Sequence, residues 1–519
     1  MTETRLDIAD RMSPARVAAT LNAAIADCAA AGGGTVVLPA GEYVSGPIEL
    51  LGHVTLHLEA GAVLRGSPCL DDYGKDDKSG ESGRVGLITA RGVQDVAITG
   101  RGVIDGQGQA FVDVDQPHLG RDYDRRYTRQ GEEYMVPASI VHGPFVPGDR
   151  PGNLVRFIDC ENVYVSGVTI RNSPTWTLAL NGCRNASILG VSIDSRASDC
   201  RVPNDDGIDL VACRRVRIAD CEIETGDDCI AIYGSREVAV TNCTLSACSA
   251  AIRIGGHLDG DVRDCTFSNL VITDTNRGIS ICVRGAGSVS DLLFANLIIR
   301  TRLYTGHWWG NGEPIHLSAV RHDREAESLG EIRNIRFQHI NASGEAGILL
   351  YGSAESVIRD VSLDDVRLTL RPSALDAAFG GNVDLRAVAD LSQAIFCHDL
   401  AAVYARHIQG LALRNLDLHW DGEMAAFYRE GILCEHFEGL QVIDHRGRQA
   451  HLDGTDAAVA LRHGRDALVR GCRAAEGTGT FLSIKDVGEC CIEGNDLTRA
   501  RAPLRPVGAV ALGVGNRLS

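Results

Sequence analysis

The sequence has few aromatic residues, no excess of positive charge and no long apolar run. Only 5% of its 519 residues are Phe, Trp or Tyr although 44% are hydrophobic, so its core must consist of stacked aliphatic side chains rather than a few large rings. The formal net charge of −17 disfavours nucleic acid and anionic membrane surfaces as partners. No apolar stretch approaches the length of a membrane span. The sequence therefore predicts neither a nucleic-acid partner nor a membrane partner.

Cysteine is abundant, but its spacing does not indicate metal binding. None of the 17 cysteines has the paired spacing of a zinc finger. Many lie inside strand-like patterns, where a thiol packs as a small apolar group; these are Cys160, Cys183, Cys213, Cys221, Cys243 and Cys265. The N-terminal residues lack a charged region followed by an apolar one, so we expect no signal peptide. The sequence therefore predicts reduced thiols, a cytoplasmic location, no cofactor and no metal.

What the sequence does contain is a short repeat. Alternating apolar runs, each introduced by a polar residue, begin at Asn162, Asn185, Arg215 and Glu237, in steps of 23, 30 and 22 residues. Alternation over a few residues between turn signals predicts strands, and many short strands at this period predict an all-β parallel β-helix. A β-sandwich or a propeller is the alternative, but a propeller would need longer repeats and more aromatic residues.

The repeat favours one β-helix domain over residues 1–519. A helix is expected over 13–31, since Ser13-Pro14 provides an N-cap and first residue and three glycines follow it. This helix would cap the open end of the coil and protect its edge. The main coils are expected over 35–370, and further coils or a C-terminal extension over 405–519.

Three charged or glycine-rich stretches lack any period and are expected to be long loops: 69–85, 107–150 and 372–400. Long loops on a rigid scaffold often shape binding sites. Three polar residues of the last stretch belong to no motif and are expected to be solvated: Asp376, Asp384 and His398.

Two acidic motifs lie one repeat apart. Asn204-Asp205-Asp206-Gly207 precedes one expected strand, and Gly226-Asp227-Asp228-Cys229 precedes the next. A coil that returns about every 22 residues would place their carboxylates on neighbouring turns of one wall. Hydrolysis of a glycosidic bond needs such a cluster, because one carboxylic acid protonates the leaving oxygen and another carboxylate activates water. Crowding raises the pKa of one carboxyl, which then stays protonated.

Several blocks together resemble bacterial polygalacturonase-like proteins of glycoside hydrolase family 28. They are GGGTVVLPAG from Gly32, RNSPTWT from Arg171, PNDDGID from Pro203 and GDDCI from Gly226. The resemblance implies a right-handed parallel β-helix and hydrolysis with inversion at the anomeric carbon. It also implies that Asp227 is the general acid and that Asp206 and Asp228 position and deprotonate water. Asp205 and Asp209 are expected instead to cap turn amides.

Two motifs of that family are missing. Its members carry Gly-His-Gly after Gly-Asp-Asp, and Arg-Ile-Lys on the next turn, which binds the substrate carboxylate. Here Ala247-Cys248-Ser249 and Ser280-Ile281-Cys282 stand at those positions. A uronate beside three aspartates needs a cation. The candidates that could replace it, unless they are merely solvated corner residues, are Arg253, Arg284 and His257.

Trp308 and Trp309 lie in a glycine-rich segment that continues to Glu313 and His316. Aromatic faces suit the C–H faces of sugar rings, while polar side chains bind the hydroxyl groups. We expect these four residues, together with Asn204, to bind substrate. The alternative for the tryptophans is a structural plug on the groove side of the coil.

The sequence thus predicts an inverting glycoside hydrolase that acts on an imported oligosaccharide or glycoside. Hydrolysis of pectin-derived galacturonides is one hypothesis. Hydrolysis or intramolecular transfer on a neutral glycan is a second, favoured by Ser280 and Cys282. A non-catalytic carbohydrate-binding β-helix is a third, and a homo-oligomer is left open.

Overall fold

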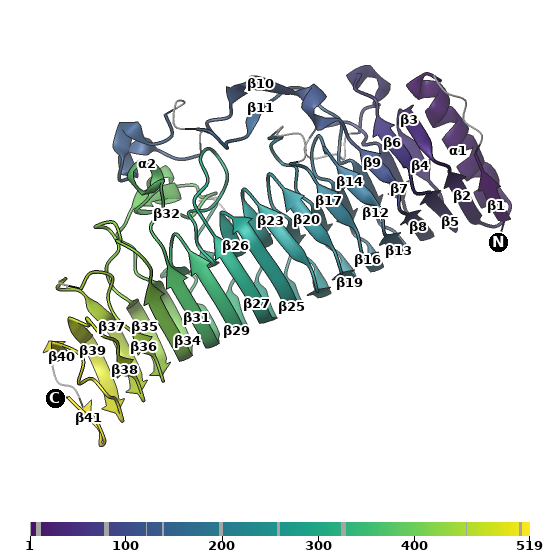
Figure 1. Ribbon diagram of the computed structural model, residues 1–519. Coiled ribbons are helices and arrows are strands. Elements are labelled where there is room, and N and C mark those ends of the chain that lie inside the picture. Colours follow the sequence, from purple (N-terminus) through teal and green to yellow (C-terminus); the bar gives the residue numbers. More distant parts are fainter. Residues whose placement is uncertain are drawn as a thin grey trace. The chain divides into compact units, whose positions relative to one another are not determined.

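The chain folds as a parallel β-helix, which confirms the predicted fold class. The computed structural model (Figure 1) describes residues 2–6, 12–76, 82–120, 122–136, 140–196, 201–256, 260–322, 328–452, 454–507 and 511–518. It contains two compact units. Unit 1 comprises Met1–His118, His142–Ile252 and Gly306–Trp308, and unit 2 comprises Leu119–Val141, Arg253–Thr305 and Trp309–Ser519.

Unit 1 consists mainly of short strands separated by tight turns. Its coil strands are β1 (Thr2–Arg5), β2 (Gly34–Leu38), β3 (Gly41–Ser45), β4 (Ile48–Leu50), β5 (Val54–Leu58), β6 (Ala62–Gly66), β7 (Ile88–Arg91), β8 (Gln94–Gly100), β9 (Val103–Asp105), β12 (Val155–Ile158), β13 (Glu161–Ser166), β14 (Thr169–Arg171), β15 (Leu178–Asn181), β16 (Arg184–Leu189), β17 (Ser192–Asp194), β18 (Ile208–Val211), β19 (Arg214–Ala219), β20 (Glu222–Thr225), β21 (Ile230–Tyr233), β22 (Arg236–Thr241) and β23 (Thr244–Ala247). The loops of this unit add η1 (Leu70–Asp72), η2 (Gly108–Phe111), β10 (Val112–Pro117) and β11 (Phe145–Pro147). The strand β24 (Ala250–Gly256) has residues in both units.

The strand register of unit 1 reproduces the sequence repeat. Val163 pairs with Ala186, and Val216 pairs with Val238, in parallel ladders. The polar residues that begin the four repeats all adopt the left-handed conformation, with φ of 58°, 57°, 59° and 58° for Asn162, Asn185, Arg215 and Glu237. Asparagine tolerates this conformation better than most residues. The predicted repeat is therefore confirmed, and its polar first residue, which is the second residue of each strand, marks a sharp bend at the start of that strand.

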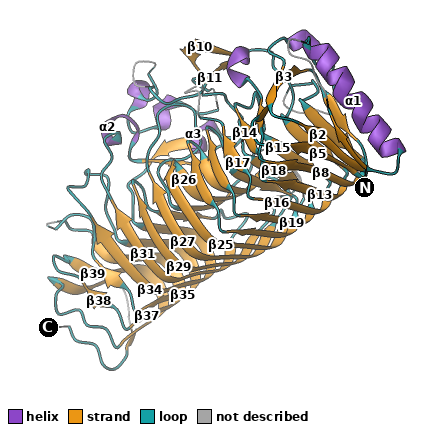
Figure 2. Cartoon of the chain, turned by 45° about the vertical axis from the view of Figure 1, so that its right-hand side comes forward, coloured by secondary structure: helices purple, strands orange, loops and turns teal. Residues whose placement is uncertain are grey.

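The predicted N-terminal helix is α1 (Pro14–Ala30), with Pro14 in its first turn. It buries Val17, Leu21 and Ile25 and packs against β3 and β4 of unit 1. Figure 2 shows it in purple beside the first strands. Among the helices that the structure describes, none has the length and apolar character needed to cross a bilayer.

Unit 2 has longer strands. They are β25 (Val262–Thr275), β26 (Arg277–Val283), β27 (Val289–Thr301), β28 (Ile315–Ala319), β29 (Ile332–Gly344), β30 (Ile348–Tyr351), β31 (Ile358–Leu370), β34 (Val403–Trp420), β35 (Ile432–Ile443), β36 (Arg446–Gly447), β37 (Ala457–Arg470), β38 (Arg473–Ala474), β39 (Thr480–Glu493), β40 (Ala502–Val507) and β41 (Ala511–Leu512). Its remaining elements are η3 (Arg125–Tyr127), η4 (Gly131–Glu133), α2 (Asp376–Phe379), β32 (Asn382–Asp384), α3 (Leu391–Ala394) and β33 (Ile395–Cys397).

The C-terminal part of the chain continues the coil. β31, β34, β35, β37 and β39 pair successively in parallel register. Of the two alternatives that the sequence left open for 405–519, the described strands therefore form further coils. The six cysteines that the sequence places in the core are buried, and the described cysteines are free thiols.

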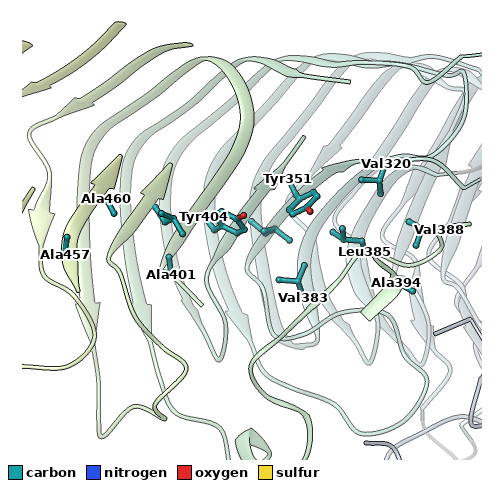
Figure 3. Close-up of a cluster of buried hydrophobic side chains, with 12 residues drawn as sticks. Val320, Tyr351, Val383, Leu385, Val388, Ala394, Ala401, Tyr404, Ala457 and Ala460 are labelled. Atoms are coloured by element: carbon teal, nitrogen blue, oxygen red, sulfur yellow. The ribbon is translucent and has the colours of Figure 1, made fainter. Parts of the chain in front are cut away.

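The segment 372–400 is not a solvated loop. Val383, Leu385 and Val388 pack with Tyr351 and Tyr404 in a buried cluster (Figure 3). This apolar packing draws the polar residues of the segment inward as well.

The prediction that the polar residues of this segment are solvated is wrong for Asp384. Its side chain is buried and forms an ion pair of 2.9 Å with Arg386. Its two neighbours in that prediction are partly buried: Asp376 accepts a hydrogen bond from Tyr428, and the His398 ring stacks 4.8 Å from Tyr404.

The interior of unit 2 contains a stack of phenylalanines whose removal should destabilise the coil. Phe294 lies between Phe267 and Phe337, with ring centroids 4.6 and 4.8 Å away. We expect Phe294→Ala to lower the free energy of unfolding by about 3–5 kcal/mol, because it leaves a cavity between two rings. Leu293→Ala, on the same strand but pointing outward, should cost less than about 1 kcal/mol. Urea denaturation measures both, and equal losses would contradict the assignment of this core.

Candidate active site

The two acidic motifs occupy equivalent positions on adjacent turns of unit 1. Each motif immediately precedes a strand, and Ile208 of β18 pairs with Ile230 of β21. The Gly207 amide donates to the Asp228 carbonyl oxygen at 2.9 Å, so Asp206 and Asp228 lie on neighbouring turns. Carboxylate oxygens of these two residues and of Asp227 all lie within 4.8 Å of one another. The spacing argument made from the sequence is therefore correct for the three predicted catalytic residues.

Backbone amides hold the acidic turns in place. Asp205 is fully buried and accepts hydrogen bonds from the amides of Asp227 at 2.7 Å and Gly226 at 3.2 Å. The Ala250 amide donates to Asp228 Oδ1 at 2.8 Å. Asp205 thus caps the turn that carries Asp227, as expected, and it fixes the position of the predicted acid.

Glycine is required at two places in these turns because the backbones approach closely. A Cβ atom on Gly207 would lie 2.5 Å from the Cys229 carbonyl oxygen, and one on Gly226 would lie 2.6 Å from Asp205 Oδ1. Both distances are far below van der Waals contact. The glycines of the two motifs therefore allow the turns to stack with their aspartates in register.

The turn before β18 is anchored by a residue that the sequence did not identify. Arg150 is buried and donates to the carbonyl oxygens of Pro203 and Pro174, and its Nη2 donates to Asn204 Oδ1 at 2.8 Å. The predicted substrate residue Asn204 thus uses its side-chain oxygen to bind Arg150. Arg150 lies in the aperiodic stretch 107–150, where no motif pointed to it.

Trp308 has a structural role in unit 1. It is 3% exposed, and its Nε1 donates to the His142 carbonyl oxygen at 2.7 Å. Its ring lies against Gly226, since a Cβ there would be 3.0 Å from the ring. This supports the alternative that Trp308 plugs the structure, immediately beside the turn of Asp227.

In unit 2, Glu313 and His316 belong to a buried polar network. Glu313 forms a 3.2 Å ion pair with Arg277 and accepts a hydrogen bond from the Asn311 amide at 2.6 Å. His316 lies 3.2 Å from Glu313 and 2.8 Å from Ser318 Oγ. Burial would raise the pKa of Glu313, but Arg277 and His316 outweigh it and hold the pKa at about 2. Glu313 is therefore an ionised partner of Arg277. Contact of Glu313 or His316 with substrate stays a prediction.

The two candidate cations of unit 2 are also buried. Arg253 stacks over Trp309, with its guanidinium carbon 4.3 Å from the ring centroid. Arg284 donates to the carbonyl oxygens of Val283, Ser318 and Leu385 and to Ser318 Oγ. The third candidate, His257, lies outside the described residues.

The positions where family 28 carries its uronate-binding bases are also occupied differently. Ser280 and Cys282 are buried, and their Oγ and Sγ atoms lie 3.4 Å apart. Burial would raise the pKa of the Cys282 thiol, but Arg284, His316 and Arg253 together hold it well below its usual range. The positive charge of this region thus faces a thiol inside the protein.

The three aspartates are also a donor set that a divalent cation could use. Hard cations such as Ca²⁺ take carboxylate oxygens as ligands, and the Asp206, Asp227 and Asp228 oxygens are close enough to share one. The same three carboxylates could therefore serve either glycosidic hydrolysis or cation binding.

A comparison with protein families bears on the first of these uses. Residues 146–375 match the model of glycosyl hydrolases family 28. This part of the chain therefore resembles family 28. A probable polygalacturonase of Vitis vinifera is 31% identical over 206 residues, which cover 38% of this chain and 36% of that protein. A probable endo-xylogalacturonan hydrolase A of Aspergillus fumigatus is 26% identical over 39% of this chain and 43% of that protein. The chain thus spans less than half of the length of these relatives.

Solved structures of exopolygalacturonases have the same fold. The Yersinia enterocolitica family 28 exopolygalacturonase matches with a TM-score of 0.58 and 18% identity, over 81% of this chain and 75% of that one. An exopolygalacturonase from Thermotoga maritima matches with a TM-score of 0.52 and 21% identity, over 69% and 83%. At these identities the likeness concerns the fold alone.

The burial of Asp205 leads to a pH-dependent prediction. Burial raises the pKa of Asp205 to about 7, although the amides of Asp227 and Gly226 oppose the shift, whereas an unfolded Asp has a pKa of about 3.9. Between these values the folded chain binds one proton more than the unfolded chain, so the stability contributed by Asp205 falls as pH rises. Asp205→Asn removes this titration. Its urea midpoint should therefore fall less between pH 5 and pH 8 than that of the wild type.

The exposed Asp220, on the same unit, provides the control. Asp220→Asn should show the wild-type change in urea midpoint between the two pH values. An Asp205→Asn variant with the full wild-type pH dependence would contradict the role given to burial.

Proposed function

We propose that this protein is an O-glycosyl hydrolase in which Asp206, Asp227 and Asp228 carry the reaction. The single observation behind the proposal is the approach of three carboxylate oxygens to within 4.8 Å in a part of the chain that resembles family 28. The names of the relatives, polygalacturonase and endo-xylogalacturonan hydrolase, support a pectin-related glycan as substrate. Cytoplasmic location and an imported oligosaccharide stay predictions.

In the proposed reaction Asp227 donates its proton to the glycosidic oxygen as the bond to the anomeric carbon breaks. Asp206 and Asp228 orient a water molecule and take its proton as the water oxygen attacks that carbon. Three carboxylates this close repel one another when all are ionised, which favours retention of a proton on one of them. The Asp205 carboxylate supports this arrangement because it binds the amide of Asp227 itself.

The stereochemistry rests on the family resemblance rather than on the spacing. Carboxyl groups about 6.5–9.5 Å apart are typical of inverting enzymes, and about 5–5.5 Å of retaining ones. The nearest oxygens here lie within 4.8 Å, so the distance alone does not favour inversion. The order in which the α and β anomers of the product appear is therefore informative.

A second candidate function is hydrolysis of a neutral glycan. Ser280 and Cys282 replace the bases that family 28 uses for a uronate, and Arg284 is held by protein oxygens. Of the candidate cations that the structure describes, this leaves Arg253 for a substrate carboxylate, and its guanidinium is stacked on Trp309. Methyl-esterified and neutral galactans therefore belong in the substrate panel beside polygalacturonate.

Substitution of the three aspartates tests the catalytic assignment. Each of Asp206→Asn, Asp227→Asn and Asp228→Asn should lower kcat by at least about 100-fold on the best substrate of the panel, because each removes an acid or base function. Reducing-sugar release measures the loss, and Asp220→Asn should keep the wild-type rate. Full activity in Asp227→Asn would rule out both hydrolase candidates. Loss of activity with EDTA and its recovery with Ca²⁺ would assign the carboxylates to a cation instead.

Proton NMR of the first product tests the stereochemistry. Cleavage of an α-linked substrate by inversion should release the β-anomer first, and mutarotation should then restore the equilibrium mixture. Initial appearance of the α-anomer would show retention and would make one of the three aspartates a nucleophile.

A further inference from the structure

Unit 2 has a pocket of about 380 Å³ that the proposed hydrolysis does not use. Its walls come from the end of β30, from β34 and from the α3–β33 segment, and include Tyr351, Ser353, Gln393, Phe396, Arg406 and His407. Its volume lies within the usual range of small-molecule sites. Figure 3 shows Tyr351 and Val320, which line it and belong to the buried cluster of unit 2. We call it the Arg406 pocket.

Arg406 forms no ion pair with a carboxylate among the residues that the structure describes. Its Nη1 donates to the Tyr351 hydroxyl at 2.8 Å, and its guanidinium carbon lies 5.3 Å from the Tyr351 ring centroid. Its Nε atom is buried and has no hydrogen-bond partner in the described part of the chain. The neighbouring carboxylate of Glu435 is bound by Arg462 at 3.3 Å and by Tyr404 at 3.1 Å. Glu435 is the register partner of Arg406 on the adjacent strand. Because its carboxylate is engaged by Arg462 and Tyr404, the half-buried Arg406 guanidinium can still bind an added anion.

A larger pocket of unit 2 is lined by arginines that, unlike Arg406, are paired with carboxylates. It has a volume of about 450 Å³ at the turns of β31, β34, β35 and β37. Its cationic side chains already contact carboxylates: Arg359 pairs with Glu331 at 2.8 Å and Arg465 with Glu438 at 2.6 Å. Unlike Arg406, these arginines have their charge compensated within the protein.

We propose that the Arg406 pocket binds a sugar residue that bears a carboxylate, that is, a uronate. The planar guanidinium can bind a carboxylate with two hydrogen bonds. The rings of Tyr351 and Phe396, with centroids 6.4 Å apart, offer apolar faces for a sugar ring. Ser353 and Gln393 line the same pocket and offer polar groups for sugar hydroxyls.

The strand register relates this arginine to the positions where the uronate-binding bases are missing. Cys282 pairs with Ser318, Ser318 with Tyr351 and Tyr351 with Arg406 on successive strands. Three strand spacings amount to about 14 Å. Arg406 therefore lies in the same side-chain column as Cys282, three strands further along the coil. The Arg406 pocket would bind an acidic sugar of the glycan at a distance from Cys282. Binding of this sugar does not require that the glycan is cleaved in the pocket.

Fluorine NMR of a fluorotyrosine-labelled protein can observe this pocket directly. The Tyr351 resonance is identified by its loss in Tyr351→Phe, and the other ten of the 11 tyrosines report on folding. Trigalacturonate should shift the Tyr351 resonance in a saturable manner in the Asp227→Asn background, which prevents turnover. Its fully methyl-esterified form, which lacks the charge, should bind at least tenfold more weakly.

Substitutions on β34 provide the decisive comparison. Arg406→Gln should weaken the trigalacturonate-induced shift at least tenfold, and Arg406→Lys should restore part of it. Arg414→Gln, which removes an exposed arginine of the same strand, should bind like the parent. Unchanged affinity in Arg406→Gln, with the other tyrosine resonances in place, would overturn the proposal. Displacement of trigalacturonate by an equal concentration of inorganic phosphate would also overturn it, since the pocket would then be a general anion site.

The result for uronate binding in the Arg406 pocket can be distinguished from the result for the proposed hydrolysis. Arg406-dependent binding in a protein that releases no reducing sugar would support the pocket and contradict the hydrolase. Hydrolysis together with Arg406-independent binding would support the hydrolase and contradict the pocket.

Discussion

The in-register pairing of parallel strands is the constraint on which the rest of this structure depends. Each strand of a parallel ladder fixes its neighbour at about 4.8 Å, and each turn of the coil repeats the side-chain positions of the previous turn. The pairing of Ile208 with Ile230 therefore determines where Asp206 and Asp228 stand. A slip of one residue would send the side chains to the opposite face. The buried Asp205, which binds the next turn through two amides, opposes such a slip at the place where the chemistry is proposed.

A second principle governs unit 2, where charged residues are buried and therefore paired. Arg277 with Glu313, and Arg386 with Asp384, are almost fully enclosed. A buried charge is stable only when hydrogen bonds and an opposite charge compensate its lost hydration. The folding of residues 376–397 over the sheet creates this environment. In this buried environment Glu313, His316 and Arg284, all predicted to contact substrate, form hydrogen bonds and ion pairs with other residues of the protein.

The two units thus contribute different things to the proposed function. Unit 1 carries the three aspartates, the turn that Arg150 holds and the buried Trp308. Unit 2 carries the arginines on which recognition of a charged sugar would depend. Asp206, Asp227 and Asp228 lie together, while Ser280 and Cys282, at the position of the missing Arg-Ile-Lys motif, are enclosed. The proposal therefore retains the catalytic group of carboxylates and leaves recognition of a charged sugar to other residues. Arg406 lines a pocket of unit 2, and its Nε has no hydrogen-bond partner among the described residues.

The sequence by itself determined the β-helix, its capping helix and the meeting of the three aspartates. Each of these features can be recognised from residue spacing along the chain. The strands follow from alternation and from a repeat of about 22 residues, and the same repeat places the aspartates on neighbouring turns. Only the tertiary structure decided the roles of Arg150, Asp384 and Arg406. The contacts of Arg150 with Asn204 and of Asp384 with Gly310 span 54 and 74 positions and follow no repeat. Tyr351 and Arg406 are register partners on successive strands, but the long segment between those strands hides their 55-position step from the sequence repeat. A loop can bring its residues over any of several turns, and burial then selects the partners of each charge. No spacing in the sequence encodes that choice.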